Sequence, residues 1–464
     1  MSAAGQAKYG SPGGAGEGVT PSSTRAYVLV PVVVTSSDSL FAHDVRDAAA
    51  RLDEAVGLAR AIDLEVVGSA ALTVKNPRPA TLLGTGKVEE LAAQLRASDV
   101  GLVAVDCALS PVQQRNLEKA WDTKVIDRTG LILEIFGRRA NTNEGRLQVE
   151  LAHLNYQKSR LVRSWTHLER QRGGFGFLGG PGETQIEADR RLIQERITRI
   201  RADLDAVRRH RALHRKGRAR VPYPAVALVG YTNAGKSTLF NRLTRAEVLA
   251  QDMLFATLDP TVRAIVLPHG RRITLSDTVG FISDLPTDLV AAFRATLEEV
   301  TQADLILHVR DISHADSGAQ AADVRRVLQE LGLGEEPANL IEVWNKLDLV
   351  EVDKRVPLLD RLKAASASLE VDQRPIAVSA LTGEGIDDLL LAIETWLASE
   401  STTRDVNLPA ADGAGLNWIY ENCEVLARGE ASEDSLIPLQ VRVPAVKRDQ
   451  FEKRFGRLTA KARA

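Results

Sequence analysis

A lysine and a serine that close a glycine-framed loop carry the clearest chemistry in this chain. Gly230 follows an apolar run, and Gly235, Lys236 and Ser237 complete the pattern G-x-x-x-x-G-K-S. In such a loop the backbone N–H groups point at phosphate oxygens, the lysine reaches the β- and γ-phosphates, and the serine hydroxyl ligates Mg²⁺. The sequence therefore predicts a nucleotide phosphate site made of Gly230, Tyr231, Thr232, Asn233, Ala234, Gly235, Lys236 and Ser237.

Two later segments are typical of switches that respond to a γ-phosphate. Residues 255–261 read FATLDPT, where a threonine hydroxyl can join Mg²⁺; Thr257 is the favoured ligand, and Thr261 competes because spacing does not separate them. Asp277 and Gly280 form D-x-x-G, in which the aspartate can hold Mg²⁺ through water and the glycine N–H can approach the γ-phosphate. The predicted contacts are Phe255, Ala256, Thr257, Leu258, Asp259, Asp277, Thr278, Val279 and Gly280.

The base is predicted to be guanine, because the next motif can read its Watson–Crick edge. Residues 345–348 read NKLD at the end of an apolar run, and an aspartate there can accept two guanine N–H groups, whereas adenine presents an acceptor. Residues 379–381 then offer a backbone N–H to the guanine carbonyl. The predicted base contacts are Asn345, Lys346, Leu347, Asp348, Ser379, Ala380 and Leu381.

These motifs together predict Mg²⁺-dependent hydrolysis of GTP to GDP and phosphate. The predicted catalytic residues are Lys236, Thr257 and Gly280: charge neutralisation falls to Lys236, Ser237, Thr257 and Mg²⁺, and the Gly280 N–H bonds to the γ-phosphate, with Ser237 and Thr257 as the metal ligands. Phe281 occupies the position after D-x-x-G, where many GTPases place a glutamine that orients the attacking water. Since a phenyl ring cannot hydrogen-bond to water, we expect slow turnover by the isolated protein, and simple core packing of Phe281 is compatible with the same expectation.

Elements that alternate between strand and helix must position these loops. The expected fold class is α/β, with residues 222–398 as the nucleotide domain and residues 26–139 as a smaller α/β domain behind a tail at 1–25. Within the smaller domain, Gly84, Gly86 and Lys87 lie at a helix start; a structural turn is the favoured interpretation and an anion site the alternative. Residues 399–464 are expected to be an acidic linker (399–412), a helix at 416–426, a strand at 437–443 and a final helix.

Residues 140–221 are predicted to form an antiparallel helical hairpin. Two runs with heptad spacing supply the apolar seams: Leu147, Leu151, Leu154, Lys158 and Leu161, and Ile193, Ile197, Ile200, Leu204 and Val207. Between them, residues 170–185 hold six glycines with Phe175, Phe177 and flanking arginines. Arginines contact phosphates and aromatic rings stack on unpaired bases, so RNA contact is favoured over a flexible hinge.

Charge is distributed unevenly along the chain. Residues 158–220 hold 17 Lys/Arg against 7 Asp/Glu, a net of +10, so the overall net charge of −2 leaves −12 for the remainder. Such segregation indicates a polyanionic partner. Two cysteines, Cys107 and Cys423, exclude a disulfide scaffold, and we see neither a signal peptide nor an apolar run long enough to enter a membrane, so a cytoplasmic protein is expected.

The motifs resemble those of one GTPase family. GYTNAGKS, FATLDPT, DTVGF, NKLD and SAL look like the signature loops of the translation-factor-related P-loop GTPases, and RGGFGFLGGPGETQ with PRPATLLGTGKVEEL and DRTGLILEIF resembles the HflX family. The resemblance covers residues 27–397 and implies binding to ribosomal RNA of the large subunit, in ribosome rescue, splitting or biogenesis, by a protein we expect to be a monomer when free. Family members are also credited with ATP hydrolysis in the N-terminal region, which residues 84–87 support only faintly.

Three alternatives stay open at this point. The same nucleotide site would serve a GTPase in another RNA process, such as tRNA modification. A non-hydrolysing RNA-binding scaffold is conceivable because of Phe281. A P-loop kinase or ATPase is disfavoured by the NKLD motif.

Overall fold

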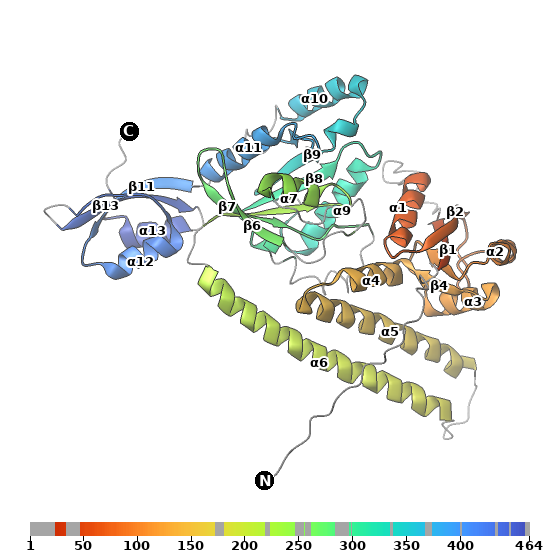
Figure 1. Cartoon of the computed structure of the whole chain (residues 1–464). Coiled ribbons are helices and arrows are strands. Elements are labelled where there is room, and N and C mark those ends of the chain that lie inside the picture. The colour runs from red at the N-terminus through yellow and green to blue at the C-terminus, as the bar shows by residue number, and fades with distance from the viewer. Residues whose placement is uncertain are drawn as a thin grey trace, which may run out of the picture.

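The computed structural model describes residues 24–33, 47–171, 181–218, 223–245, 255, 261–283, 297, 299–334, 337–366, 374–399, 401–431, 435–444 and 447–459. The smaller domain and a C-terminal module lie on either side of the nucleotide domain, and two long helices run beneath the nucleotide domain and the smaller domain (Figure 1). The predicted α/β class, with its hairpin and small α+β module, is confirmed. The glycine-rich segment with Phe175 and Phe177, and Ala256 to Asp259 of the first switch, lie outside the described residues.

The N-terminal domain is a parallel four-stranded sheet in the order β2-β1-β3-β4. Apolar side chains alternate along β1, so Val28 and Val30 face helices α1 and α4, and Tyr27 and Leu29 face α2 and α3. The elements are β1 (Arg25–Val33), α1 (Ala48–Arg60), β2 (Glu65–Val74), α2 (Thr85–Ala97), β3 (Leu102–Val105), α3 (Pro111–Trp121), β4 (Lys124–Asp127) and α4 (Arg128–Arg139).

The hairpin consists of α5 (Asn143–Gln171) and α6 (Pro181–Arg218), which pack against each other. Ile197, Ile200 and Leu204 of the predicted seam are buried. On α5 the buried residues are Val149 and Ala152, while the predicted leucines of that helix are only half-buried, because α5 also packs on α4 of the N-terminal domain.

The nucleotide domain is a six-stranded sheet in the order β10-β9-β8-β5-β7-β6, parallel except for the edge strand β6. Its central strands are buried on both faces, as expected when helices cover a sheet. The elements are β5 (Ala225–Gly230), α7 (Lys236–Thr244), β6 (Thr261–Val266), β7 (Arg272–Asp277), β8 (Leu305–Asp311), α9 (Ser317–Glu330), β9 (Leu340–Asn345), the 3₁₀ turn η1 (Leu347–Leu349), α10 (Val352–Ser366), β10 (Ile376–Ala377) and α11 (Ile386–Ser399).

The C-terminal module differs from the expectation in two places. The stretch expected as a linker forms strand β11 (Ser401–Pro409), whose Val406 and Leu408 are buried while its other face is polar. The helix expected at 416–426 ends early: α12 (Gly413–Asn422) gives way to strand β12 (Glu424–Arg428). With β13 (Leu436–Pro444) and α13 (Arg448–Phe455), these elements form a three-stranded antiparallel sheet covered by two helices.

Among the described residues, we find no helix with the length and apolar character that a bilayer crossing requires.

A buried histidine in β8 should make the nucleotide domain sensitive to acid. Burial lowers the pKa of His308 to about 3, and Arg310 opposes its protonation further, although Glu342 favours it. Since the unfolded imidazole titrates near 6.5, the unfolded chain binds the proton first as pH falls, and stability is lost between pH 6.5 and 3. We expect the free energy of unfolding of the domain, measured in urea, to fall by about 1.6 kcal/mol between pH 6.5 and pH 5, with a slope that approaches ~1.4 kcal/mol per pH unit below the unfolded pKa.

The variant His308→Gln isolates this effect. It should be less stable at neutral pH and should lose less stability than the wild type between pH 6.5 and 5. Glu342 does not obscure the comparison, because Arg310 holds the pKa of its carboxyl at about 2, below an unfolded value of 4.5, so its contribution is lost only at lower pH. Equal acid slopes for the two proteins would contradict the prediction.

Candidate nucleotide site

The predicted phosphate loop lies between the buried strand β5 and the start of α7. Lys236 is buried, and its ammonium donates to the carbonyl oxygens of Gly230 (3.2 Å) and Tyr231 (2.8 Å). Burial lowers the pKa of this lysine to about 8, with Asp277 acting in the opposite direction. An anion at the loop would restore the favourable environment that the buried cation lacks.

Gly235 is required where the loop turns into α7. Its φ of +90° lies in the left-handed region, and a Cβ there would clash with the Asn345 side-chain amide. Asn345, at the end of β9, uses that amide to donate to the Ala234 carbonyl (2.8 Å), and its oxygen accepts from the Ala380 N–H (2.9 Å). One asparagine thereby joins the phosphate loop, the NKLD loop and the SAL loop.

The D-x-x-G segment packs directly on the phosphate loop. Asp277 ends β7 with no exposed surface and accepts a hydrogen bond from the Ser237 hydroxyl (2.7 Å). Thr278 donates to the Leu228 carbonyl (2.6 Å), and Val279 is buried. A Cβ on Gly280 would lie 2.9 Å from Thr232 Cα and 3.1 Å from the Lys236 ammonium nitrogen.

Phe281 is 1% exposed and joins the apolar core, so its ring is not directed at solvent. Its backbone forms a short parallel bridge with the phosphate loop. The Phe281 N–H donates to the Gly230 carbonyl (3.0 Å), and its carbonyl accepts from the Thr232 N–H (2.7 Å). The core-packing alternative therefore describes where this side chain lies.

The NKLD and SAL loops, which are predicted to read the base, meet beside the phosphate loop and the D-x-x-G segment. The Asp348 carboxylate accepts from the Ser379 hydroxyl (2.6 Å), and the Leu347 N–H donates to the Val378 carbonyl (3.2 Å). Lys346 forms an ion pair with Asp311 at the end of β8 (2.8 Å). Of the remaining predicted contacts, Asn233 is exposed, with a φ of +59°, Leu381 is exposed, and Phe255 is buried.

The first switch is the part of the site that the structure describes least. Thr257, the favoured metal ligand, lies outside the described residues together with Ala256, Leu258 and Asp259. Its competitor Thr261 is the first residue of β6 and pairs with Asp277 across the strands.

Several residues at the site escaped sequence reasoning. Arg242 of α7 donates to the Ala380 carbonyl (3.1 Å) and contacts the Leu381 carbonyl, so it supports the SAL loop. Asp311 could have been noticed as a carboxylate at the end of a buried strand. Glu54 and Arg128 of the N-terminal domain also reach the site, although DRTG around Arg128 carried no chemical signal of its own.

The second glycine-lysine segment has different surroundings. Gly84 caps α2 without a side-chain bond, a Cβ on Gly84 or Gly86 would meet nothing within 4 Å, and Lys87 pairs with Glu90 on the surface (2.7 Å). This geometry favours a structural turn.

Comparison with known proteins covers almost the whole chain. Family models described as GTP-binding GTPase N-terminal, GTP-binding GTPase Middle Region, 50S ribosome-binding GTPase and HflX C-terminal domain match residues 49–137, 139–218, 225–346 and 365–464. The chain is 50% identical to the GTPase HflX of Magnetococcus marinus, over 86% of this chain and 90% of that protein. It is 46% identical to the GTPase HflX of Escherichia coli, over 80% and 84%. Among solved structures, a GTP-binding protein of Sulfolobus solfataricus in complex with GDP is similar at 22% identity and a TM-score of 0.42, over 80% of this chain and 98% of that one.

Proposed function

The chain belongs to the HflX family of GTPases, and we propose that it acts on the large ribosomal subunit. In this proposal it is a cytoplasmic factor, monomeric when free, that contacts ribosomal RNA through the hairpin and serves in ribosome rescue, splitting or biogenesis. The observation that carries the proposal is the row of exposed arginines on α6, within a stretch of the chain (residues 158–220) that has a net charge of +10. The description of the model matched by residues 225–346, a 50S ribosome-binding GTPase, supports the same partner.

The exposed face of α6 has the chemistry of an RNA-backbone contact. Six exposed arginines recur along its described length and alternate with five exposed carboxylates, while the opposite face is buried against α5. Guanidinium groups bind phosphate oxygens with two parallel N–H bonds, and clustered positive charge draws a polyanion at long range. The exposed arginines are Arg190, Arg191, Arg196, Arg199, Arg201 and Arg209.

A shallow groove between the helices adds polar contacts to this face. Lys158 of α5 and three arginines of α6 line it together with Glu187 and Glu195, and Lys158 donates to the Gln194 side chain (2.5 Å). A-form RNA presents its phosphates and 2′-hydroxyls on ridges, which a basic groove of this kind can follow without reading sequence.

Hydrolysis at the nucleotide site would rest on positioning and charge neutralisation. Lys236 would neutralise the β- and γ-phosphates, and the Gly280 N–H would bond to the γ-phosphate. Asp348 would accept the guanine N–H groups, and the loop from Ser379 to Leu381 would close over the base. The first switch, from Phe255 to Asp259, would complete the γ-phosphate side.

Mg²⁺ suits the oxygen donors at this site. The Ser237 hydroxyl and the Asp277 carboxylate lie 2.7 Å apart beside the phosphate loop, and Mg²⁺ prefers such oxygen ligands together with phosphate. Ser237 and Thr257 would hold the ion directly and Asp277 through water. When bound, it would neutralise charge on the transferred phosphoryl group.

Slow intrinsic hydrolysis follows from Phe281, whose buried ring offers no hydrogen bond to an attacking water. We expect purified large subunits to raise GTP turnover at least tenfold, because the partner would supply or order the missing group, as an activating protein can by ~10³–10⁵. The measurement is phosphate release with and without subunits, alongside co-sedimentation in GDP, GTP and a non-hydrolysable analogue. Fast turnover by the isolated protein, or no co-sedimentation in any nucleotide, would contradict the proposal.

Charge reversal on α6 tests the hairpin directly. The double variant Arg191→Glu/Arg199→Glu should weaken subunit binding at least tenfold, and the plot of log affinity against log salt should lose about one to two units of slope. The matched control is Arg60→Glu/Arg96→Glu, which makes the same charge change on exposed positions of α1 and α2. If both doubles weaken binding equally, the contact is not on the hairpin.

A further inference from the structure

Two loops of the nucleotide site are tied to the N-terminal domain by a cluster of four side chains, Glu54, Arg128, Tyr231 and Ser283, which we call the cross-domain joint. Tyr231 of the phosphate loop donates to Glu54 (2.6 Å) and accepts from the Ser283 N–H (3.0 Å). Arg128 binds the carboxylate of Glu54 (2.6 Å) and donates to the hydroxyl (2.9 Å) and carbonyl (3.1 Å) of Ser283. Every backbone and side-chain polar group of Ser283 is therefore engaged in the joint.

The joint lies at the carboxyl edge of the N-terminal sheet. Arg128 directly follows β4, and its second partner, Asp106, directly follows β3. Open α/β sheets ordinarily bind their ligands beyond the carboxyl ends of the strands, at the point where the strand order reverses. In the order β2-β1-β3-β4 this point lies beside β1. In this protein the phosphate-loop tyrosine and Ser283 contact Glu54 of α1 and Arg128 after β4 at this edge.

The positive charge of Arg128 in the joint is stabilised by two carboxylates, those of Asp106 and Glu54. Burial lowers the pKa of Arg128, but Asp106 and Glu54 raise it by more, so the guanidinium remains charged and paired. Loss of either partner of such a buried pair is costly, because the other charge is left without its counterion. Glu54 and Arg128 therefore fix each other's position beside Tyr231 and Ser283.

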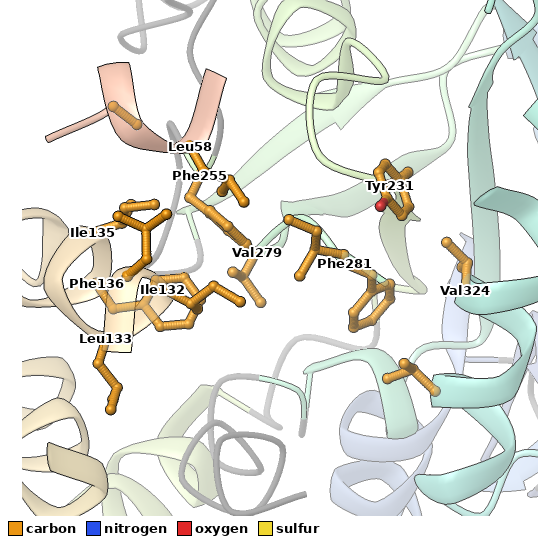
Figure 2. Close-up of a cluster of buried hydrophobic side chains, with 14 of the residues drawn as sticks. Leu58, Ile132, Leu133, Ile135, Phe136, Tyr231, Phe255, Val279, Phe281 and Val324 are labelled. Carbon is orange, nitrogen blue, oxygen red and sulfur yellow. The ribbon is translucent and has the colours of Figure 1, made fainter. Parts of the chain in front are cut away.

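Apolar contacts support the joint on one side. Phe255 of the first switch packs edge-on against Phe136 of α4, with ring centroids 4.7 Å apart. Val279 and Phe281 belong to the same buried cluster as Ile132 of α4. Figure 2 shows Phe255 and Val279 next to α4, with Phe281 beside Tyr231.

The joint holds the D-x-x-G segment closed against the phosphate loop. The Phe281 carbonyl takes the Thr232 N–H, which belongs to the loop whose amides cradle phosphate, and Gly280 rests against Thr232 and the Lys236 ammonium. A γ-phosphate needs the same lysine and the Gly280 N–H. A γ-phosphate would therefore compete with this arrangement for the lysine and for the space beside Gly280, whereas GDP lacks the group that competes.

We propose that Glu54 and Arg128 are positioning residues that set how strongly the site prefers GDP over GTP. They act through Tyr231 and Ser283: while the joint is intact it holds Ser283, hence Gly280 and Phe281, against the phosphate loop. A ligand shifts such an equilibrium only by its differential affinity for the two states, so the γ-phosphate is the part of GTP that opens the joint. By reciprocity, any partner that opens the joint raises the affinity for GTP.

The test compares affinities for GDP and the β,γ-imido analogue of GTP in the full chain. Tyr231→Phe keeps the ring and removes the hydroxyl that links Glu54 to Ser283. We expect the ratio of the two affinities to move about tenfold toward the analogue, the size expected when hydrogen bonds of ordinary strength are lost. Glu54→Gln, which lies in the other domain, should move the ratio in the same direction.

The ratio of the two affinities separates this role from a general loss of packing, because a loss of packing would weaken the binding of both nucleotides alike. The matched control is Arg160→Lys, because Arg160 forms a comparable half-buried pair with Asp127 (2.5 Å) inside the N-terminal half. Its ratio should stay at the wild-type value. The proposal is overturned if both test variants keep the wild-type ratio, if both nucleotides weaken equally, or if the analogue loses affinity relative to GDP.

Discussion

Replacing Asp348 by asparagine is expected to transfer the site's preference from guanine to xanthine nucleotides. The carboxylate lies in the turn η1 that follows β9 and accepts from the Ser379 hydroxyl (2.6 Å), and Asn345 joins the two base-reading loops. Asparagine would turn an amide N–H toward the guanine N–H groups, leaving buried donors unpaired, whereas xanthine offers a carbonyl there. Hydrogen bonds to a charged group contribute about 1.5–3 kcal/mol each, so GDP affinity should fall at least about a hundredfold.

The measurement is competition of GDP and xanthosine diphosphate for one fluorescent nucleotide. Asp353→Asn is the control, since it makes the same chemical change in the first turn of α10, at an exposed position of the same domain. It should leave base preference unchanged. If the Asp348→Asn protein still favoured guanine, the assignment of Asp348 as the residue that reads the base would be wrong.

The second large effect is expected from Gly235→Ala. A methyl group there meets the Asn345 amide and must also hold a φ of +90°, which costs an L-residue ~1–2 kcal/mol. Because Asn345 braces both Ala234 and Ala380, its displacement should loosen the phosphate and base loops together. We expect nucleotide affinity to fall by more than about a hundredfold, a loss of ~3 kcal/mol.

Gly86→Ala is the matched control, because Gly86 also precedes a lysine at the start of a helix. A methyl group at Gly86 meets nothing, so nucleotide affinity should be unchanged, and α2 should gain slightly in stability. Titration with a fluorescent GDP analogue measures both variants. Wild-type affinity in Gly235→Ala would contradict the geometry, and lost GDP affinity in Gly86→Ala would reopen the anion-site alternative.

The nucleotide loops could be identified from sequence because their chemistry is local. G-x-x-x-x-G-K-S, D-x-x-G and NKLD each combine a few fixed residue types with the end of an apolar strand, and parallel strands bring those ends to one edge. The fold class follows from the same alternation of strand and helix. Both inferences depend on local sequence patterns and require no knowledge of contacts between residues that are distant in the chain.

Two elements are hard to predict from sequence, for opposite physical reasons. Helix α4 is buried on nearly all sides, so the apolar run from Leu131 to Phe136 lacks the one-sided periodicity of a surface helix. Strand β11 is polar on one face and looked like a linker, since only Val406 and Leu408 face the core. Its pairing partner, β13, comes later in the chain, and no local signal announces that pairing.

The cross-domain joint lay beyond sequence reasoning altogether. Glu54 and Tyr231 are separated by 177 positions, and each alone resembles an ordinary surface acid or core aromatic residue. Only the packing of α1 and α4 onto the phosphate loop gives them a shared role.

Helix α6 has a mechanical consequence when its two attachments are considered together. Its 38 residues, at ~1.5 Å per residue, make a rod about 57 Å long, so a rotation of about 5° at one end displaces the other by about 5 Å. The rod ends at Arg218, shortly before β5 and the phosphate loop, while its partner α5 is fastened to the N-terminal domain through Tyr156 and Asp127 (2.6 Å). A small change in the angle between the two domains would therefore shift the far end of the hairpin by several ångströms, about 5 Å for a rotation of about 5°.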